Sequence, residues 1–211
     1  MSLDTPSAEA RRDWILELKP DRLTPQHSAY QVTFVTAGGQ PSQNPLLHRI
    51  EVFSDFECPA CREFYLMTIR QVLRDYSSLN KVCVVYHEFP LPAHKYSREA
   101  ARDSKAAQKL GRKQWLAVMD ALYEHQPVWT QNGSVDDVVF KALGVDDYAA
   151  LRRILLQPFV DAAIESELAL GRTKGVTSTP TMFVYAGGKE QKVVGGVPYP
   201  VLKGFFDSIV K

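Results

Sequence analysis

Residues 47–61 read LHRIEVFSDFECPAC, and this segment decides the fold. Its first seven residues, through Phe53, are rich in apolar residues and are typical of a short core strand. Ser54–Glu57 then turn the chain into a helix that begins near Pro59. Val82–Tyr86 is apolar without alternation, as in a strand that is covered on both faces. The helix between the two strands has an apolar face at helical spacing, made of Tyr65, Ile69, Val72, Leu73 and Tyr76. This order predicts a β-α-β unit with parallel strands and a right-handed crossover.

Two of the three cysteines, Cys58 and Cys61, lie at the first turn of this helix. At this spacing their side chains can approach within disulfide-bonding distance. Pro59 favours the first turn because its φ is fixed and it has no N–H to leave unpaired. Free amide N–H groups and the positive end of the helix dipole face Cys58, so we expect a thiolate whose pKa falls from about 8.5 into the range of roughly 3.5–7.5. Cys58 is therefore the predicted nucleophile, and the more buried Cys61 is predicted to resolve the mixed disulfide.

Half of a zinc site is the alternative interpretation of a CxxC pair. Structural zinc usually has four Cys or His ligands, which commonly include a second close pair. The chain has five histidines, and none forms a close pair with another or with Cys83. The strand-to-helix placement of the CxxC pair favours redox chemistry, so we predict no metal. Cys83 lies inside the second apolar strand, where we expect a buried and inert thiol.

Residues from about 93 to 174 show only helical patterns, and we expect five helices there. The first is capped by Ser97 and ended by Gly111, and the second runs from Arg112 to about His125. The third begins with a capping box of Ser134 and Asp137 and ends at Gly144, the fourth begins near Asp146, and the fifth has Pro158 at its first position. This block interrupts the sheet and is expected to pack as a subdomain beside it.

The two ends of the chain add further elements. Thr181–Tyr185 predicts a strand, Ala186–Lys189 a Gly-Gly hairpin turn, and Gln191–Val194 the partner strand. The last helix has Val201, Leu202, Phe205, Phe206 and Ile209 on one face. Near the N-terminus we expect a helix from Thr5 to about Leu18 and a strand at Gln31–Thr36. The fold class is therefore α/β, with a mixed sheet that has helices on both faces. Trp14, Trp115 and Trp129 are expected in the core or in an interface.

The bulk composition excludes several classes of protein. With 211 residues, of which 45% are hydrophobic and 23% charged, the chain can bury a core without disulfides. The formal net charge of +1, with acids and bases mixed, gives no electrostatic reason to expect nucleic acid as a partner. No apolar run is long enough to span a membrane, and the first residues lack the basic and apolar regions of a signal peptide.

Three stretches resemble the DsbA-like branch of the thioredoxin superfamily. Phe53–Cys61 resembles the active-site segment of that branch. Glu88–Pro92 (EFPLP), with His94 and the Ala-rich helix that follows, resembles the entry into its inserted helical domain. Gly175–Val184 (GVTSTPTMFV) resembles its cis-proline loop leading into a strand. The order and spacing of these motifs make the match specific from about Leu47 to the C-terminus.

The resemblance implies a thioredoxin-like mixed sheet with an inserted helical subdomain. The thioredoxin-like domain would comprise residues 47–92 and 175–211, the helical insertion residues 93–174, and an N-terminal extension residues 1–46. The resemblance also implies a cis bond between Thr179 and Pro180. The loop would then lie against Cys58, and the backbone of Thr179 would pair with an extended substrate strand.

One position departs from the thioredoxin-like pattern. Many such proteins carry a buried acid six residues before the first active cysteine, where this chain has Val52. Glu51 is adjacent but should point to the opposite face of the strand. Glu57 and Glu88 are candidate substitutes for proton transfer at Cys61, although we expect each to be a solvated surface charge.

Further residues near the cysteines are candidates for a supporting role. His87 and His94 flank the Phe89–Pro92 turn, where either would tune Cys58, although we expect a hydrogen-bonding structural role for both. Pro59 and Ala60, between the cysteines, and Thr179, before the proline, are positions that tune the reduction potential.

The predicted function is thiol–disulfide exchange with protein substrates, by a protein-disulfide oxidoreductase that needs no cofactor beyond its Cys58–Cys61 pair. Its partners would be protein or peptide thiols and disulfides and a redox partner protein. The direction stays open, because reduction potentials in this superfamily run from about −270 mV to about −120 mV. Related proteins usually work outside the cytoplasm, so we expect a periplasmic or other extracytoplasmic location, which a membrane tether in the full-length product would also fit. Three alternatives remain: a reductase linked to glutathione or mycothiol, a peptide-binding or chaperone module with incidental cysteines, and a zinc-stabilised domain.

Overall fold

A computed structural model describes residues 48–76, 82–186 and 189–209. The helix and the strand expected within residues 1–46 lie outside the described residues, as does Trp14. The described chain divides into two compact units. The first combines residues 48–53 with the described residues of 63–87 and of 180–209. The second combines Ser54–Arg62 with Glu88–Thr179. The domain boundaries expected from the sequence stay a prediction.

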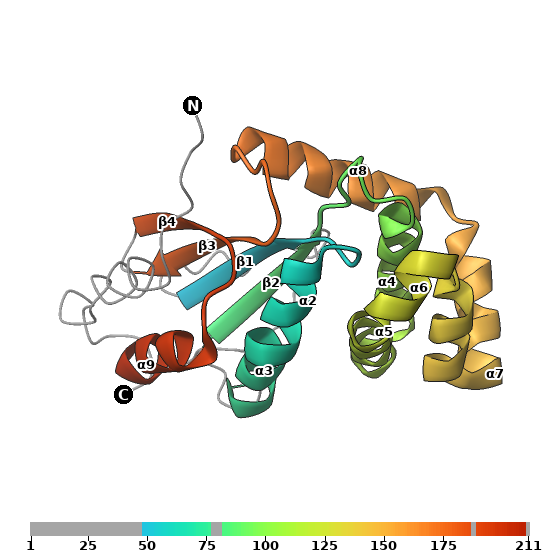
Figure 1. The fold of residues 1–211 in the computed structure, drawn as a ribbon, viewed down its shortest axis with the longest axis horizontal. Helices are drawn as coiled ribbons and strands as arrows, with labels where there is room; N and C mark the ends of the chain where they lie inside the picture. Colours follow the sequence, from blue (N-terminus) through green and yellow to red (C-terminus); the bar gives the residue numbers. More distant parts are fainter. Residues whose placement is uncertain (1–47, 77–81, 187–188, 210–211) are drawn as a thin grey trace. The chain divides into compact units, whose positions relative to one another are not determined.

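A mixed four-stranded sheet forms the centre of the first unit. Its strands are β1 (His48–Ser54), β2 (Val82–Glu88), β3 (Thr181–Ala186) and β4 (Lys189–Val194), in the order β2-β1-β3-β4. β1 and β2 run in the same direction (Figure 1), whereas β3 is antiparallel to both β1 and β4. This arrangement confirms the predicted pairing of β1 with β2 and the predicted hairpin of β3 and β4. Cys83 lies in β2, but its side chain is outside the described part of the structure.

Helices with apolar faces cover this sheet. The segment after β1 consists of α2 (Pro59–Phe64), a π-helical stretch η2 (Tyr65–Ile69) and α3 (Arg70–Tyr76). Its predicted apolar face is confirmed, because all five residues named for it are buried. The sequence predicted one uninterrupted α-helix here, and the π-helical stretch corrects that prediction. In α9 (Tyr199–Ile209), Leu202, Phe205 and Phe206 are buried as expected.

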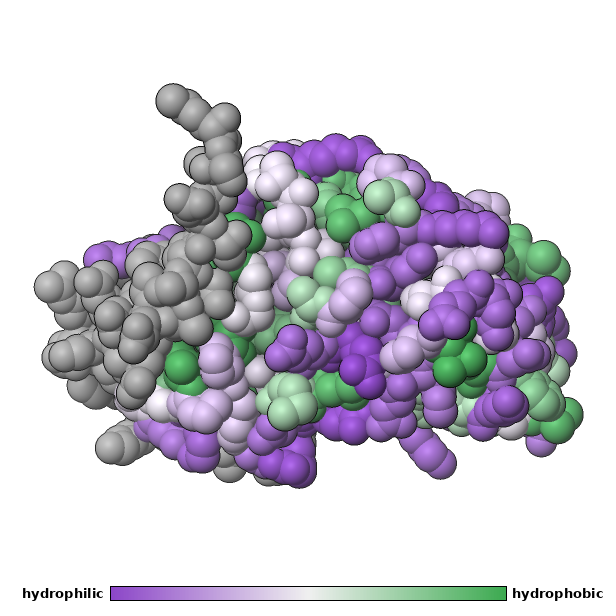
Figure 2. All heavy atoms as spheres, in the orientation of Figure 1, coloured by the Kyte–Doolittle hydropathy of each residue, from purple (hydrophilic) through white to green (hydrophobic). Residues whose placement is uncertain are grey.

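The second unit is built mainly from helices. They are α4 (Ser97–Leu110), α5 (Arg112–Glu124), α6 (Gln126–Asn132), α7 (Val135–Leu155) and α8 (Pro158–Thr173). α4 packs against α5, α7 and α8, and α5 also packs against α7. Trp115 and Trp129 are buried, which confirms their predicted place in the core. In Figure 2 the apolar side chains on the visible face form separate patches among polar ones.

The helices of this unit differ from the prediction in three respects, namely one additional helix and two predicted caps. The sequence analysis missed α6. Ser134 does not form a capping box with Asp137, because its hydroxyl donates to Asn132 Oδ1 at 2.7 Å. Ser97 is not a helix cap either, because it is the first residue of α4 and its hydroxyl donates elsewhere. The predicted ends of helices at Gly111 and Gly144 are confirmed, the latter as a break within α7 where Gly144 has φ 76°.

Within the described ranges no helix has both the length and the apolar character that crossing a membrane requires.

Candidate active site

Cys58 and Cys61 lie where the turn after β1 enters α2, as the sequence predicted. The turn is closed by Cys58 N–H, which donates to the carbonyl of Asp55 at 3.2 Å. The helix then begins with Arg62 N–H donating to the carbonyl of Cys58 at 3.1 Å. Both cysteines are free thiols, and Cys58 is 8% exposed whereas Cys61 is fully buried. Of the two cysteines, only Cys58 therefore keeps some exposure to solvent.

The two thiols have opposite acidities. The side-chain hydrogen bond from Cys61 is the largest influence on Cys58 and, against the effect of burial, lowers its pKa from 9.0 to about 6. Hydrogen bonds from the Thr179 side chain and from the backbone of Cys61 and Ala60 act in the same direction. Burial raises the pKa of Cys61 well above its usual value, and the hydrogen bond and charge of Cys58 raise it further. At neutral pH the pair therefore carries one negative charge, on Cys58, and one proton, on Cys61.

Thr179 faces Cys58 from the end of the segment before β3. Cys58 Sγ donates to the carbonyl oxygen of Thr179 over 3.4 Å, when the thiol is protonated. The next residue, Pro180, is buried, and its carbonyl accepts from Gly195 N–H at 2.8 Å within the first unit. The structure thus brings Thr179, one of the predicted substrate-binding residues, to the sulfur of the predicted nucleophile.

The buried side chain of Asp55 is a feature that the sequence analysis missed. Its carboxylate accepts hydrogen bonds from Ser97 Oγ at 2.6 Å and from His94 Nδ1 at 2.7 Å. The backbone N–H groups of Glu57 and Leu91 donate to it as well, each at 2.8 Å. An Asp in a turn ordinarily caps its own backbone. No signal in the sequence alone links Asp55 to His94 and Ser97, which lie 39 and 42 residues away.

Helices α5 and α6 support the segment that carries the cysteines. Gln126 Nε2 donates to the carbonyls of Phe56 and Cys58, at 2.6 and 3.0 Å. The hydroxyls of Tyr123 and Ser54 are 2.9 Å apart, and Arg62 Nε donates to the carbonyl of Tyr123 at 2.8 Å. Because Gln126 begins α6, the helix missed in the sequence analysis supplies the side chain that holds the Cys58 carbonyl.

Glu57 and Glu88, the two candidate substitutes for the buried acid that is absent at Val52, lie in different environments. Glu57 is half-buried, and its carboxylate accepts from Tyr96 N–H at 2.7 Å. Glu88 is buried, so the prediction that it is a solvated surface charge is wrong. Burial, together with the nearby charges of Glu167 and Asp55, raises the pKa of Glu88 to about 8 although Lys105 opposes the shift. Glu88 is therefore largely protonated at neutral pH.

Glu88 belongs to a buried polar cluster. Its carboxyl accepts from Ser104 Oγ at 2.6 Å, and Ser104 Oγ in turn accepts from Trp115 Nε1 at 2.9 Å. Glu167 accepts from the backbone N–H of Glu88 at 2.8 Å and pairs with Lys105 Nζ at 2.7 Å. The cluster ties the residue at the end of β2 to α4 and α8.

The remaining residues considered in the sequence analysis are Pro59, Ala60, His87, Val52 and Glu51. Pro59 and Ala60 are exposed. His87 stacks on Phe53 in the first unit, with the ring centroids 4.4 Å apart. Val52 is buried, so no carboxylate occupies the position of the buried acid. Glu51 accepts from the Tyr185 hydroxyl at 2.9 Å and pairs with Arg49, consistent with its predicted orientation away from Val52.

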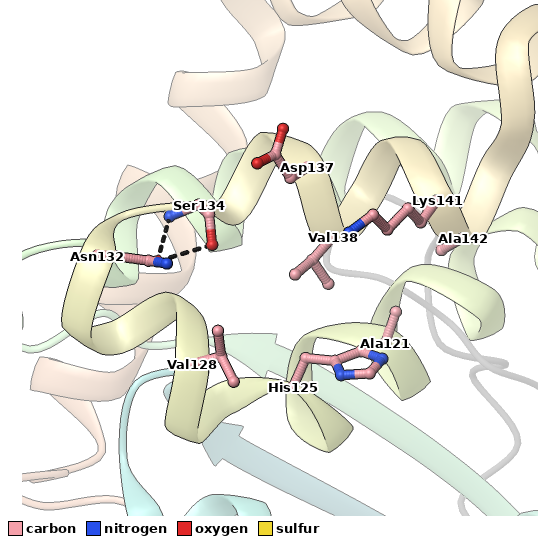
Figure 3. A pocket seen from close by; sticks show the side chains of 9 residues that line it. All are labelled: Ala121, His125, Val128, Asn132, Ser134, Asp137, Val138, Lys141 and Ala142. Carbon is pink, nitrogen blue, oxygen red and sulfur yellow. Dashed lines mark hydrogen bonds between the residues drawn. The ribbon is translucent and has the colours of Figure 1, made fainter.

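A separate cavity of about 400 Å³ lies among α5, α6 and α7 in the second unit (Figure 3). Its lining does not include the cysteines; it consists of Ala121, His125, Val128, Asn132, Ser134, Asp137, Val138, Lys141 and Ala142. Among the residues that the structure describes, no cluster of His, Cys, Asp or Glu has an arrangement that could hold a metal ion.

Comparison with known proteins gives the family. A family model described as Thioredoxin matches residues 47–192. The chain belongs to the thioredoxin family. A search of the curated proteins found no match.

Solved structures share the fold of this thioredoxin-family chain. A periplasmic thioredoxin-like protein from Salmonella enterica serovar Typhimurium matches with 21% identity over 79% of this chain and 86% of its own, with a TM-score of 0.61. A thioredoxin-like oxidoreductase from Silicibacter pomeroyi DSS-3 matches with 25% identity over 79% and 88%, with a TM-score of 0.59. The thiol-disulfide exchange protein alpha-DsbA2 from Wolbachia pipientis matches with 17% identity over 98% and 100%, with a TM-score of 0.65. The predicted thioredoxin-like fold with an inserted helical segment is thereby confirmed.

Proposed function

We propose that this protein exchanges disulfides with protein substrates through Cys58 and Cys61. The observation that carries the proposal is the pair of opposite acidities, an 8%-exposed Cys58 with a pKa of about 6 beside a fully buried Cys61. A thiolate near neutral pH that a buried partner thiol can reach is what a two-step exchange requires. The names of the thioredoxin-like oxidoreductase and of alpha-DsbA2 agree with this chemistry.

In the reducing direction, the Cys58 thiolate attacks one sulfur of a substrate disulfide, and the other substrate sulfur leaves as a thiolate. Cys61 then loses its proton and attacks Cys58 Sγ, which breaks the mixed disulfide and releases the first substrate sulfur as a second thiolate. Two electrons pass to the substrate, and Cys58 and Cys61 end as a disulfide. The oxidising direction is the reverse of these steps, and the potential of the partner decides which one runs.

Substrate backbone would bind along the segment that ends at Thr179. The Thr179 carbonyl, 3.4 Å from Cys58 Sγ, is close enough for a peptide held by the Thr179 backbone to present its sulfur to Cys58. A cis bond between Thr179 and Pro180 belongs to this proposal. So does an extracytoplasmic location, in keeping with the periplasmic Salmonella protein of similar fold.

Reduction of insulin by dithiothreitol tests the proposal. Wild type is expected to accelerate the precipitation of the insulin B chain, and Cys58→Ser is expected to lose that acceleration. Cys83→Ser is the matched control, because it removes a thiol but keeps the pair. Equal activity of wild type and Cys58→Ser would refute disulfide exchange and favour a binding module with incidental cysteines.

A further inference from the structure

Asp55 is a buried carboxylate in the segment that carries the cysteines. Its side chain is fully buried, and an unpaired carboxylate in such a place would be strongly destabilising. All four of its partners are donors, two for each oxygen: Glu57 N–H and Ser97 Oγ bind Oδ1, and Leu91 N–H and His94 Nδ1 bind Oδ2. This set stabilises the ionised form, because a carboxylic acid would present its own proton to a donor.

His94 is the only one of these four partners that can carry a charge. Its side chain is 24% exposed, and its Nδ1 lies 2.7 Å from Asp55 Oδ2. Burial lowers the pKa of His94, but the hydrogen bond and charge of Asp55 outweigh it, and the charges of Glu57 and Cys58 add to them. The pKa of His94 is therefore raised from its ordinary value. The influence of the Cys58 charge on His94 is reciprocal, so a protonated His94 favours the Cys58 thiolate.

The backbone of Asp55 also contacts both cysteines. Its carbonyl accepts from Cys58 N–H at 3.2 Å, and its N–H donates to Cys61 Sγ over 3.4 Å. The residue that binds His94 through its carboxylate thus fixes the turn in which the two cysteines approach each other.

We propose that Asp55 and His94 form a positioning pair, in which the buried carboxylate retains a protonated imidazole that stabilises the reduced form of the Cys58–Cys61 pair. The inference rests on the proposed function and assigns the regulation of the same site. Reduction by glutathione consumes two glutathione thiols and yields one glutathione disulfide, a thiol at Cys61 and a thiolate at Cys58, with one proton released to solvent. A positive charge that favours this thiolate makes the protein disulfide more oxidising.

The test compares His94→Asn with Ser97→Ala. His94→Asn keeps a donor near the position of Nδ1 but removes the charge, whereas Ser97→Ala removes a neutral donor from the same carboxylate. His94→Asn is expected to raise the pKa of Cys58, followed by thiolate absorbance, and to shift the equilibrium with glutathione about three- to tenfold toward the protein disulfide. Ser97→Ala is expected to stay within about twofold of wild type on both measurements, since it changes no charge. His94→Lys restores a positive charge and is expected to return both values toward wild type.

Two results would overturn the inference. The first is that the acid dissociation constant of Cys58 and the glutathione equilibrium constant of His94→Asn stay within about twofold of wild type, while its circular dichroism spectrum shows that the variant is folded. The second is that Ser97→Ala or His94→Lys shifts them as far as His94→Asn does, in which case the carboxylate only supports the local fold. The insulin assay separates this failure from that of the proposed function, because wild type and Cys58→Ser must differ there whatever His94 does.

Discussion

Removal of the Cys61 thiol tests how the site makes Cys58 acidic. The hydrogen bond from Cys61 is the largest of the contributions that lower the pKa of Cys58 from 9.0 to about 6. At pH 7 a pKa of about 6 leaves about 90% of Cys58 as thiolate, whereas a pKa of about 9 leaves only about 1%. Cys61→Ala is expected to raise the pKa of Cys58 by at least about one unit, so that about half or less of Cys58 is a thiolate at pH 7.

Cys61→Ser is the matched control, because a hydroxyl in the same place can still donate a hydrogen bond to the Cys58 sulfur. Its Cys58 is expected to titrate closer to wild type than that of Cys61→Ala. The thiolate is followed by its ultraviolet absorbance against pH, and the rate of Cys58 alkylation by iodoacetamide at pH 7 is followed by peptide mass spectrometry. The reasoning fails if Cys58 of Cys61→Ala still titrates at about 6, because the amides and Thr179 would then account for the whole effect.

Three further substitutions test the support of the site, each by urea unfolding. Because folding raises the pKa of Glu88 from 4.5 to about 8, the folded protein binds this proton more tightly than the unfolded chain, and wild type loses stability as the pH rises through this range. The glutamine of Glu88→Gln cannot titrate, so the free energy of unfolding of this variant is expected to rise relative to that of wild type between pH 5 and pH 9, by at most about 5 kcal/mol. A difference in unfolding free energy that stays constant over this pH range would contradict the reasoning. Gln126→Leu leaves the buried carbonyls of Phe56 and Cys58 without this donor and is expected to cost about 1–3 kcal/mol at pH 7, whereas no loss would show that these carbonyls find other partners. Gly133→Ala is expected to cost about 1–3 kcal/mol, because Gly133 has φ 74° and a Cβ there would lie 2.7 Å from the Tyr96 ring; wild-type stability would mean that the ring moves aside freely.

Features set by neighbouring residues could be predicted from the sequence. The start of α2 at Pro59, the β3–β4 hairpin and the end of α4 before Gly111 all follow from local rules of backbone conformation. The acidity of Cys58 was predicted on similar grounds, from its position at a helix start. In the structure, however, the Cys61 thiol contributes more to the low pKa of Cys58 than the backbone amides do. The direction was right, but the main cause is a side chain.

Features set by residues far apart in the sequence could not be predicted. The donors to Asp55 include Leu91, His94 and Ser97, which lie 36 to 42 residues away, and no spacing rule links them to a turn. Glutamate is usually a surface residue, and only the fold shows that Ser104 and the Lys105–Glu167 pair surround Glu88. The sequence predicts Ser97 as the cap of the helix that it begins, because a Ser before a helical pattern is a common cap. In the structure its hydroxyl instead donates to the carboxylate of Asp55.

These long-range contacts connect the helical segment to the turn that carries the cysteines. Ser54–Arg62, the segment with both cysteines, belongs to the same compact unit as the helices of Glu88–Thr179. Within this unit α4 contributes Ser97, α5 contributes Tyr123 and α6 contributes Gln126 to the cysteine segment. The bonds of Tyr123 and Gln126 reach Ser54 and the carbonyls of Phe56 and Cys58, so these two side chains hold the backbone from which the Cys58 thiol projects. Substitutions of Tyr123 and Gln126 are therefore expected to alter the rate at which Cys58 is alkylated at pH 7.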